Sequence, residues 1–360
     1  MNTMFHAKKY ESVTLKPFCY ITPSVRTVSW CTLVLLVPQV VLLAVSGSTA
    51  ALAVLLSSLT ASVLSELAYS ARTRPLRGAW LTAVIQGTMI ALLLPENYAP
   101  AAVFFVVFCS LLLEKFAFGG FAGSWANPVV LAVSVAYFLN MGAFPAYGVS
   151  SNDVLSRNAA LSLIQNGSVP LVGADVTVTA FLNRTVFRLF GIVVPEGYVT
   201  LFWDSGSTIP AFRFNTVTLI SSIILISFDM VDALIPLCFT AVYAVLVRFA
   251  GPLLVGGHGG QGDMLLALLT SGTLFCTLYV LQWYGTTPVT RLGKVLYGVL
   301  AGMIAFLVVG CGTSPVGAVF TVLVMNVLSP MIQVFESRDV RNTVANVLVP
   351  RAVELEVEHV

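Results

Sequence analysis

The stretch GGFAGSWANP, residues 119–128, has the composition of a binding turn for a flat ligand. Its glycines, Gly120 among them, let backbone approach a ring closely, and Ser124 and Asn127 add hydrogen-bonding side chains. Pro128 starts the next apolar run where its missing N–H costs nothing. The residue types predict a site for a planar heterocycle. A structural turn ahead of a helix has the same composition, and that alternative stays open.

Few ionisable residues lie inside the apolar runs. Glu66 is one, about two turns before Arg72, and a buried carboxylate there is either part of an ion pathway or simply paired near the membrane surface. Asp229 and Asp232 flank a short turn and suit either a cation route or ordinary loop polarity. We expect Glu114 and Lys115 to be interfacial anchors. No chain of buried acids indicates a proton relay.

A second polar stretch, WDSGSTIP at 203–210, carries three hydroxyls on a flexible turn: Ser205, Ser207 and Thr208. These hydroxyls could accept a covalently attached group, with Thr208 as the candidate acceptor. The stretch could equally be the turn that enters the next apolar segment.

Several classes of site are not indicated by any pattern. There is no Walker A or dinucleotide motif, no Ser-His-Asp arrangement and no metal-ligand spacing, and the six cysteines are scattered without a CxxC pair. We therefore predict no metal site and no self-contained catalytic residues.

Composition places the chain in a bilayer. Of 360 residues, 58% are hydrophobic and only 9% charged, whereas soluble domains carry about a quarter charged residues. The formal net charge of +2 gives no nucleic-acid surface. A span needs roughly 20 apolar residues. Ten runs qualify: 27–45, 49–69, 79–95, 98–115, 127–145, 215–231, 233–251, 263–284, 293–311 and 314–335. The sequence thus predicts an all-α polytopic membrane protein.

The ten spans divide into five plus five. We expect an N-terminal segment at 1–26, a first membrane half at 27–145, a long outward loop at 146–213, a second half at 214–335 and a tail at 336–360. With both termini inside, thirteen of the 18 lysines and arginines fall on the cytoplasmic side. Internally repeated transporter-like folds share this layout and bind ligands near the midplane.

Three ordered motifs resemble those of the family that contains the D subunit of the Rnf electron-transport complex and the B subunit of the sodium-translocating NADH:quinone reductase. Thr287-Pro288-Val289, then Gly293-Lys294 and Tyr297-Gly298, are similar to the family's TDPVSAPxTxxGKxxYG pattern. The final span ends Asn326-Val327-Leu328-Ser329-Pro330, which is similar to the family's A-N-LxxP, and GGFAGSWANP looks like its GGLGxNPFNPA.

The resemblance implies a bacterial inner-membrane subunit that works with other subunits of a redox complex and binds flavin, as FMN, riboflavin or both. By carry-over Asn127 is the first flavin contact, and Ser124 stands where the family has its first Asn. The family also esterifies FMN to a threonine early in the outward loop, which corresponds here to 153–160, where no threonine occurs. Covalent attachment would then have moved to Thr208 or been lost.

The leading hypothesis is therefore a membrane subunit that carries electrons through bound flavin and couples them to Na⁺ or H⁺ movement. Two alternatives remain: a secondary transporter or channel for a small solute, and a scaffold subunit that has lost its covalent flavin.

Overall fold

The computed structural model describes residues 23–73, 79–119, 126–145, 171–254, 256–311, 314 and 316–357, the last nineteen of them by their backbone alone. The described residues form helices and turns without a strand. The first half consists of α1 Val25–Val45, α2 Thr49–Ser70, α3 Ala79–Leu93, α4 Pro100–Phe118 and α5 Pro128–Leu139. The second half consists of α10 Asn215–Ser227, α11 Leu234–Leu254, the segment α12 Met264–Thr270 with α13 Thr273–Phe275 and the π-helix Cys276–Val280, then α14 Arg291–Val309 and α15 Gly317–Val357.

These elements confirm an all-α polytopic membrane protein. Six helices in the described part of the chain are long and apolar enough to cross a bilayer: α1, α2, α4, α11, α14 and the first 22 residues of α15. Three shorter apolar helices, α3, α5 and α10, and the divided segment 264–280 coincide with the other four predicted spans. The helices start where the sequence supplies a cap. Ser24, Asn127, Asp263 and Thr290 each accept an N–H of the following first turn.

The two halves repeat one packing pattern in opposite directions. In the first half α2 packs on α3 and α4, and α4 on α5; in the second, α11 packs on α12 and α14, and α14 on α15. The halves meet where α1 packs on α10 and α5 on α15. Because five segments in the first half carry the chain to the opposite end, the second half starts from there and is inverted, as in many transporters.

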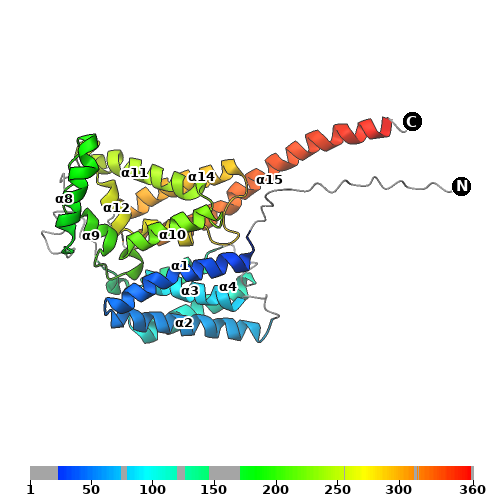
Figure 1. Cartoon of the computed structure of the whole chain (residues 1–360). Helices are drawn as coiled ribbons and strands as arrows, with labels where there is room; N and C mark the ends of the chain where they lie inside the picture. The colour runs from blue at the N-terminus through cyan, green and yellow to red at the C-terminus, as the bar shows by residue number, and fades with distance from the viewer. Residues whose placement is uncertain are drawn as a thin grey trace, which may run out of the picture.

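Figure 1 shows the two ends of this bundle. The start of α1 and the C-terminal part of α15 lie at one end, which we call the terminal face, and α8 and α9 lie at the other, which we call the loop face. α15 leaves the bundle at the terminal face as one 41-residue helix that continues through the boundary expected at residue 335.

The described part of the segment between the halves is folded. It contains α8 Asp175–Thr185, the 3₁₀ turn Phe187–Phe190, α9 Tyr198–Trp203 and the 3₁₀ turn Pro210–Phe212. The buried Asp175 carboxylate accepts hydrogen bonds from the backbone of Gly197, from the backbone and hydroxyl of Thr200 and from Thr179. Although burial acts to raise the pKa of Asp175, these donors hold it below its usual value. One carboxylate therefore fixes α9 against α8.

The third span of the second half is interrupted at Ser271 and Gly272. Gly272 has φ +67, and a Cβ there would lie 1.8 Å from the ring of Phe212, so the missing side chain makes room for that ring. Asn215 donates to the Leu269 carbonyl at the end of α12, and the Ser271 hydroxyl bonds back to Ala267. Side chains thus replace the helix bonds lost at the break, which makes an interrupted helix tolerable at membrane depth.

Candidate functional site

A cavity of about 240 Å³ lies at the terminal face between α1, α3, α10 and the end of the interrupted span. Its position follows from Pro23 and Val25 at the start of α1 and from Met230 and Val231 in the turn after α10. The remaining lining residues are Val28, Thr32, Ile85, Met89, Leu225, Leu278, Tyr279, Gln282, Trp283 and Tyr284. The volume is slightly below the roughly 300–1,000 Å³ of ordinary ligand pockets. The space suits a ring system better than a whole nucleotide.

The aromatic wall of the cavity is held from several elements. The Tyr284 hydroxyl lies 2.8 Å from the Ser29 hydroxyl of α1, and the Trp283 and Tyr284 rings meet edge to face at 5.2 Å. The Gln282 amide pairs in both directions with the backbone of Asp232, at 3.0 and 2.9 Å. The wall is therefore positioned before any ligand binds.

The Asn127 side chain also holds this wall in place. Its side chain is fully buried; Oδ1 accepts from the Val129 N–H at 2.9 Å and Nδ2 donates to the Val280 carbonyl at 2.8 Å. Val280 ends the π-helix that carries Tyr279 into the cavity. The amide thus joins the start of α5 to the cavity wall. Gly120 and Ser124, the other two predicted contacts in this stretch, lie outside the described residues.

Glu66 is paired. Its carboxylate lies 2.8 Å from the Lys115 ammonium, which also donates to the Ser65 hydroxyl at 3.1 Å. Both charged side chains are largely buried, at 13% and 4% exposed. The expectation that Glu114 and Lys115 are interfacial anchors is wrong, because both residues are buried among the helices, at 2% and 3% exposed. Packing of α2 against α4 brings the opposite charges together.

Asp229 and Asp232 lie in the turn between α10 and α11. Asp229 adopts φ +51, and Asp232 forms an ion pair of 2.5 Å with Lys294 while its other oxygen accepts the Leu234 N–H. Partial burial acts to raise the pKa of Asp232, but the hydrogen bonds from Lys294 and Leu234 keep it below its usual value. The two residues between them in the sequence, Met230 and Val231, line the cavity.

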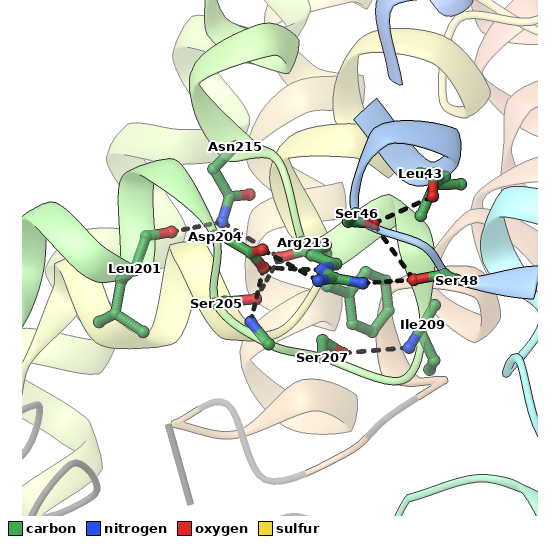
Figure 2. A network of polar contacts seen from close by, with 12 residues as sticks. Leu43, Ser46, Ser48, Leu201, Asp204, Ser205, Ser207, Ile209, Arg213 and Asn215 are labelled. Carbon is green, nitrogen blue, oxygen red and sulfur yellow. Dashed lines mark hydrogen bonds and ion pairs between the residues drawn. The ribbon is translucent and has the colours of Figure 1, made fainter. Parts of the chain in front are cut away.

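The WDSGSTIP stretch and Arg213 form a network of polar contacts, which we call the clamp (Figure 2). Arg213 binds Asp204 through two hydrogen bonds of 2.7 and 3.0 Å and reaches Ser48, between α1 and α2, at 2.8 Å. The Ser205 hydroxyl donates to the Phe212 carbonyl. These contacts therefore tie the segment between the halves to the turn between α1 and α2.

Thr208 belongs to the same clamp. Its carbonyl accepts the Glu96 N–H at 2.9 Å, while its hydroxyl oxygen is buried without a hydrogen-bond partner. In this conformation the hydroxyl faces protein. The alternative acceptor region, 153–160, lies outside the described residues.

Sequence reasoning missed Tyr279, Gln282 and Trp283. Their signal was present as a Ser271-Gly272 interruption followed by the aromatic run Tyr279-Val280-Leu281-Gln282-Trp283-Tyr284. An interrupted span at membrane depth lines a site more often than a continuous one does.

Comparison with known proteins settles the family. Residues 12–341 match the model described as the NQR2, RnfD, RnfE family. The chain belongs to this family. The resemblance found in three sequence motifs is thereby confirmed over nearly the whole chain.

Curated relatives of the family match at low identity. The chain is 23% identical over 261 residues to the D subunit of the Na(+)-translocating ferredoxin:NAD(+) oxidoreductase complex of Acetobacterium woodii, covering 71% of this chain and 70% of the relative. It is 20% identical over 336 residues to the proton-translocating counterpart of Clostridium ljungdahlii, covering 91% and 95%. It is 25% identical over 308 residues to the D subunit of the ion-translocating oxidoreductase complex of Cellvibrio japonicus, covering 78% and 81%.

Proposed function

We propose that this protein is a membrane subunit of an ion-translocating electron-transport complex and carries electrons through a flavin bound in the cavity at the terminal face. The observation that carries the proposal is the cavity itself, walled by Tyr279, Trp283 and Tyr284 in a chain of the NQR2, RnfD, RnfE family. Relatives named as the D subunit of translocating oxidoreductases support the complex.

The size and the lining of the cavity support an isoalloxazine ring as its ligand. Aromatic faces and the two methionines offer flat apolar contact, and the buried Tyr279 hydroxyl has no hydrogen-bond partner of its own. A flavin supplies one- and two-electron chemistry when bound. Trp283 and Tyr284 would hold the group by their rings, Tyr279 and Gln282 would supply polar contacts, and Asn127 fixes the cavity wall through Val280.

Non-covalent binding agrees best with the described residues. A phosphoester at Thr208 would require its buried hydroxyl to turn outward. Mass spectrometry of the outward-segment peptides would detect an FMN adduct and identify its residue.

The terminal face is proposed to be cytoplasmic in a bacterial inner membrane, because most lysines and arginines outside the spans belong to that side. Substituted-cysteine labelling at Ser337 and at Thr185, which are both exposed, would test the orientation with an impermeant reagent. Thr185 should react in intact spheroplasts and Ser337 only after permeabilisation.

The test of the flavin proposal is to purify the chain together with its partner subunits, isolate it and release its flavin with acid. We expect the wild type to yield flavin and Trp283→Leu to lose most of it. Trp203→Leu is a matched control, because Trp203 is 58% exposed at the opposite face. Absence of flavin from the wild type, or equal content in Trp283→Leu, would contradict the proposal.

A further inference from the structure

The turn that follows α8 carries exposed apolar side chains at residues 189–193, Leu-Phe-Gly-Ile-Val, which we call the apolar tip. Leu189 and Val193 are 81% and 82% exposed, and Phe190 is 70% exposed. The tip lies at the loop face, outside the six helices long enough to cross a bilayer. A contiguous apolar surface outside the spans marks a site of interaction with a protein or with a membrane.

The apolar tip is held in one conformation by hydrogen bonds. The Gly191 N–H donates to the Arg188 carbonyl, and Gly191 adopts φ +65, which turns the chain back. The Asn183 side chain of α8 then binds Val194 in both directions, accepting its N–H and donating to its carbonyl, each at 2.9 Å. A fixed turn therefore presents the apolar side chains.

The helix before the tip buries polar residues and exposes apolar ones. Asp175 and Thr179 of α8 are buried, and the Asp175 carboxylate is bonded to α9. Val176, Val178 and Phe181 of the same helix are exposed. A helix on the surface of a soluble protein does the reverse and turns its apolar side inward. The exposed side of α8 therefore suits an apolar environment better than water.

The direction of α8 places it along the membrane surface. Figure 1 shows α8 running across the direction of α11 and α14, two helices that are long and apolar enough to span the bilayer. Helices that lie along the surface bury apolar side chains at the boundary between headgroups and acyl chains. Trp203 ends α9, which contacts α8, and is exposed as well. Tryptophan is enriched at that same boundary.

Two arginines accompany the apolar side chains. Arg184 lies in the last turn of α8 and Arg188 in the turn before the tip, and both are exposed. Among the described residues neither guanidinium has an ion-pair partner. A guanidinium binds phosphate through paired hydrogen bonds. Phospholipid headgroups supply phosphates directly above the acyl chains, so that one membrane surface satisfies both the arginines and the apolar tip.

We propose that the apolar tip inserts into the lipid leaflet at the loop face, with Phe181 in the same leaflet and with Arg184 and Arg188 bound to phospholipid phosphates. This inference goes beyond the proposed function and does not depend on the flavin. Because Asp175 joins α8 to α9, insertion of the tip would hold both helices of the segment between the halves at a fixed depth.

The experiment is photocrosslinking in the complete complex, reconstituted in nanodiscs of phosphatidylethanolamine and phosphatidylglycerol. The photoreactive residue p-benzoylphenylalanine replaces Phe190 or Val193, whose side chains are exposed, and mass spectrometry identifies the adducts. We expect phospholipid adducts at both positions. Their yield should be several-fold higher than at Glu196, an exposed charged residue of the same segment that serves as the matched control.

Two results would overturn the proposal. Adducts of Phe190 and Val193 with another subunit of the complex, in place of phospholipid, would assign the tip to a protein interface. A phospholipid yield no higher than that at Glu196 would show that the tip lies in water.

A second measurement tests the arginines. The double variant Arg184→Gln with Arg188→Gln should lower the phospholipid yield at Phe190 several-fold, because the tip loses its contacts with the headgroups. Arg72→Gln is the control, since Arg72 is exposed beyond the end of α2. An undiminished yield in the double variant would contradict the phosphate contacts.

Discussion

The third spans of the two halves occupy equivalent places in an inverted repeat but are built differently. α3 runs without interruption over Ala79–Leu93, while its counterpart is divided into α12, α13 and a π-helix. The divided span depends on other elements, since Asn215, Asn127 and Tyr297 bind its carbonyls at Leu269, Val280 and Leu281. Both spans line the cavity, α3 through Ile85 and Met89, but the aromatic wall comes from the interrupted span. The interrupted helix of the cavity wall thus belongs to the second half.

The largest effect is expected at Gly272. Gly272→Ala combines backbone strain at φ +67, about 1–3 kcal/mol, with overpacking against Phe212 of about 1–3 kcal/mol or more. We expect little folded protein by detergent size-exclusion chromatography. Gly47→Ala is the control in the first half, because Gly47 has φ +74 but open space around it. Equal loss in both variants would mean that the Phe212 contact contributes nothing.

The next prediction concerns Lys115 in the first half, whose third span is uninterrupted. Lys115→Met leaves the Glu66 carboxylate buried without its partner, which should cost about 3–5 kcal/mol in thermal or denaturant unfolding. The double variant Lys115→Met with Glu66→Gln should recover most of that loss. Failure of the double variant to recover would show that the pair is not the reason for the loss.

Two variants of Asn127 distinguish its role as the cap of α5 from its role in holding the cavity wall. Asn127→Asp keeps an acceptor for the Val129 N–H but removes the donor to Val280, whereas Asn127→Ala removes both. Each should destabilise by about 1–3 kcal/mol, and both should lower flavin content. If Asn127→Asp keeps full flavin content, the tie to Val280 does not position the cavity wall.

The smallest effect concerns the ion pair Asp232–Lys294, which is 25–29% exposed and worth about 1 kcal/mol or less. The pKa of Asp232 is lowered from 3.8, so its contribution is complete above pH 3.8 and fades as the pH falls through the folded-state pKa. Asp232→Asn should lose this contribution above pH 3.8 and match the wild type in strong acid. Chemical denaturation at pH 6 and pH 2 measures the difference.

The sequence predicted the spans well because membrane crossing requires long apolar runs, and even the divided eighth span falls within the predicted 263–284. It also selected Asn127, whose direct contact with a flavin stays a prediction, but a Gly-rich stretch ending in Asn-Pro does not say which protein groups the amide bonds to. The partner, Val280, lies 153 residues away, and only the packing of the halves brings the two together.

The WDSGSTIP stretch is a second case in which the residue types did not predict the contacts. Its hydroxyls predicted either an attachment site or a turn, and attachment at Thr208 stays a prediction. The sequence did not predict the ion pair between Asp204 and Arg213, or the hydrogen bond from Arg213 to Ser48 between α1 and α2. Tyr279 and Trp283 were missed because aromatic residues in an apolar run carry no periodic signal that separates a cavity wall from a lipid-facing surface.

The most direct measurement of the central claim is the fluorescence of the flavin in the purified complex, with other flavin-bearing subunits subtracted. Trp283 and Tyr279 in contact with an isoalloxazine ring would quench its emission by electron transfer. The variant carrying Trp283→Phe and Tyr279→Phe, which keeps aromatic packing, should therefore show emission several times brighter at equal flavin content. Unchanged emission from a fully loaded variant would contradict a flavin in this cavity.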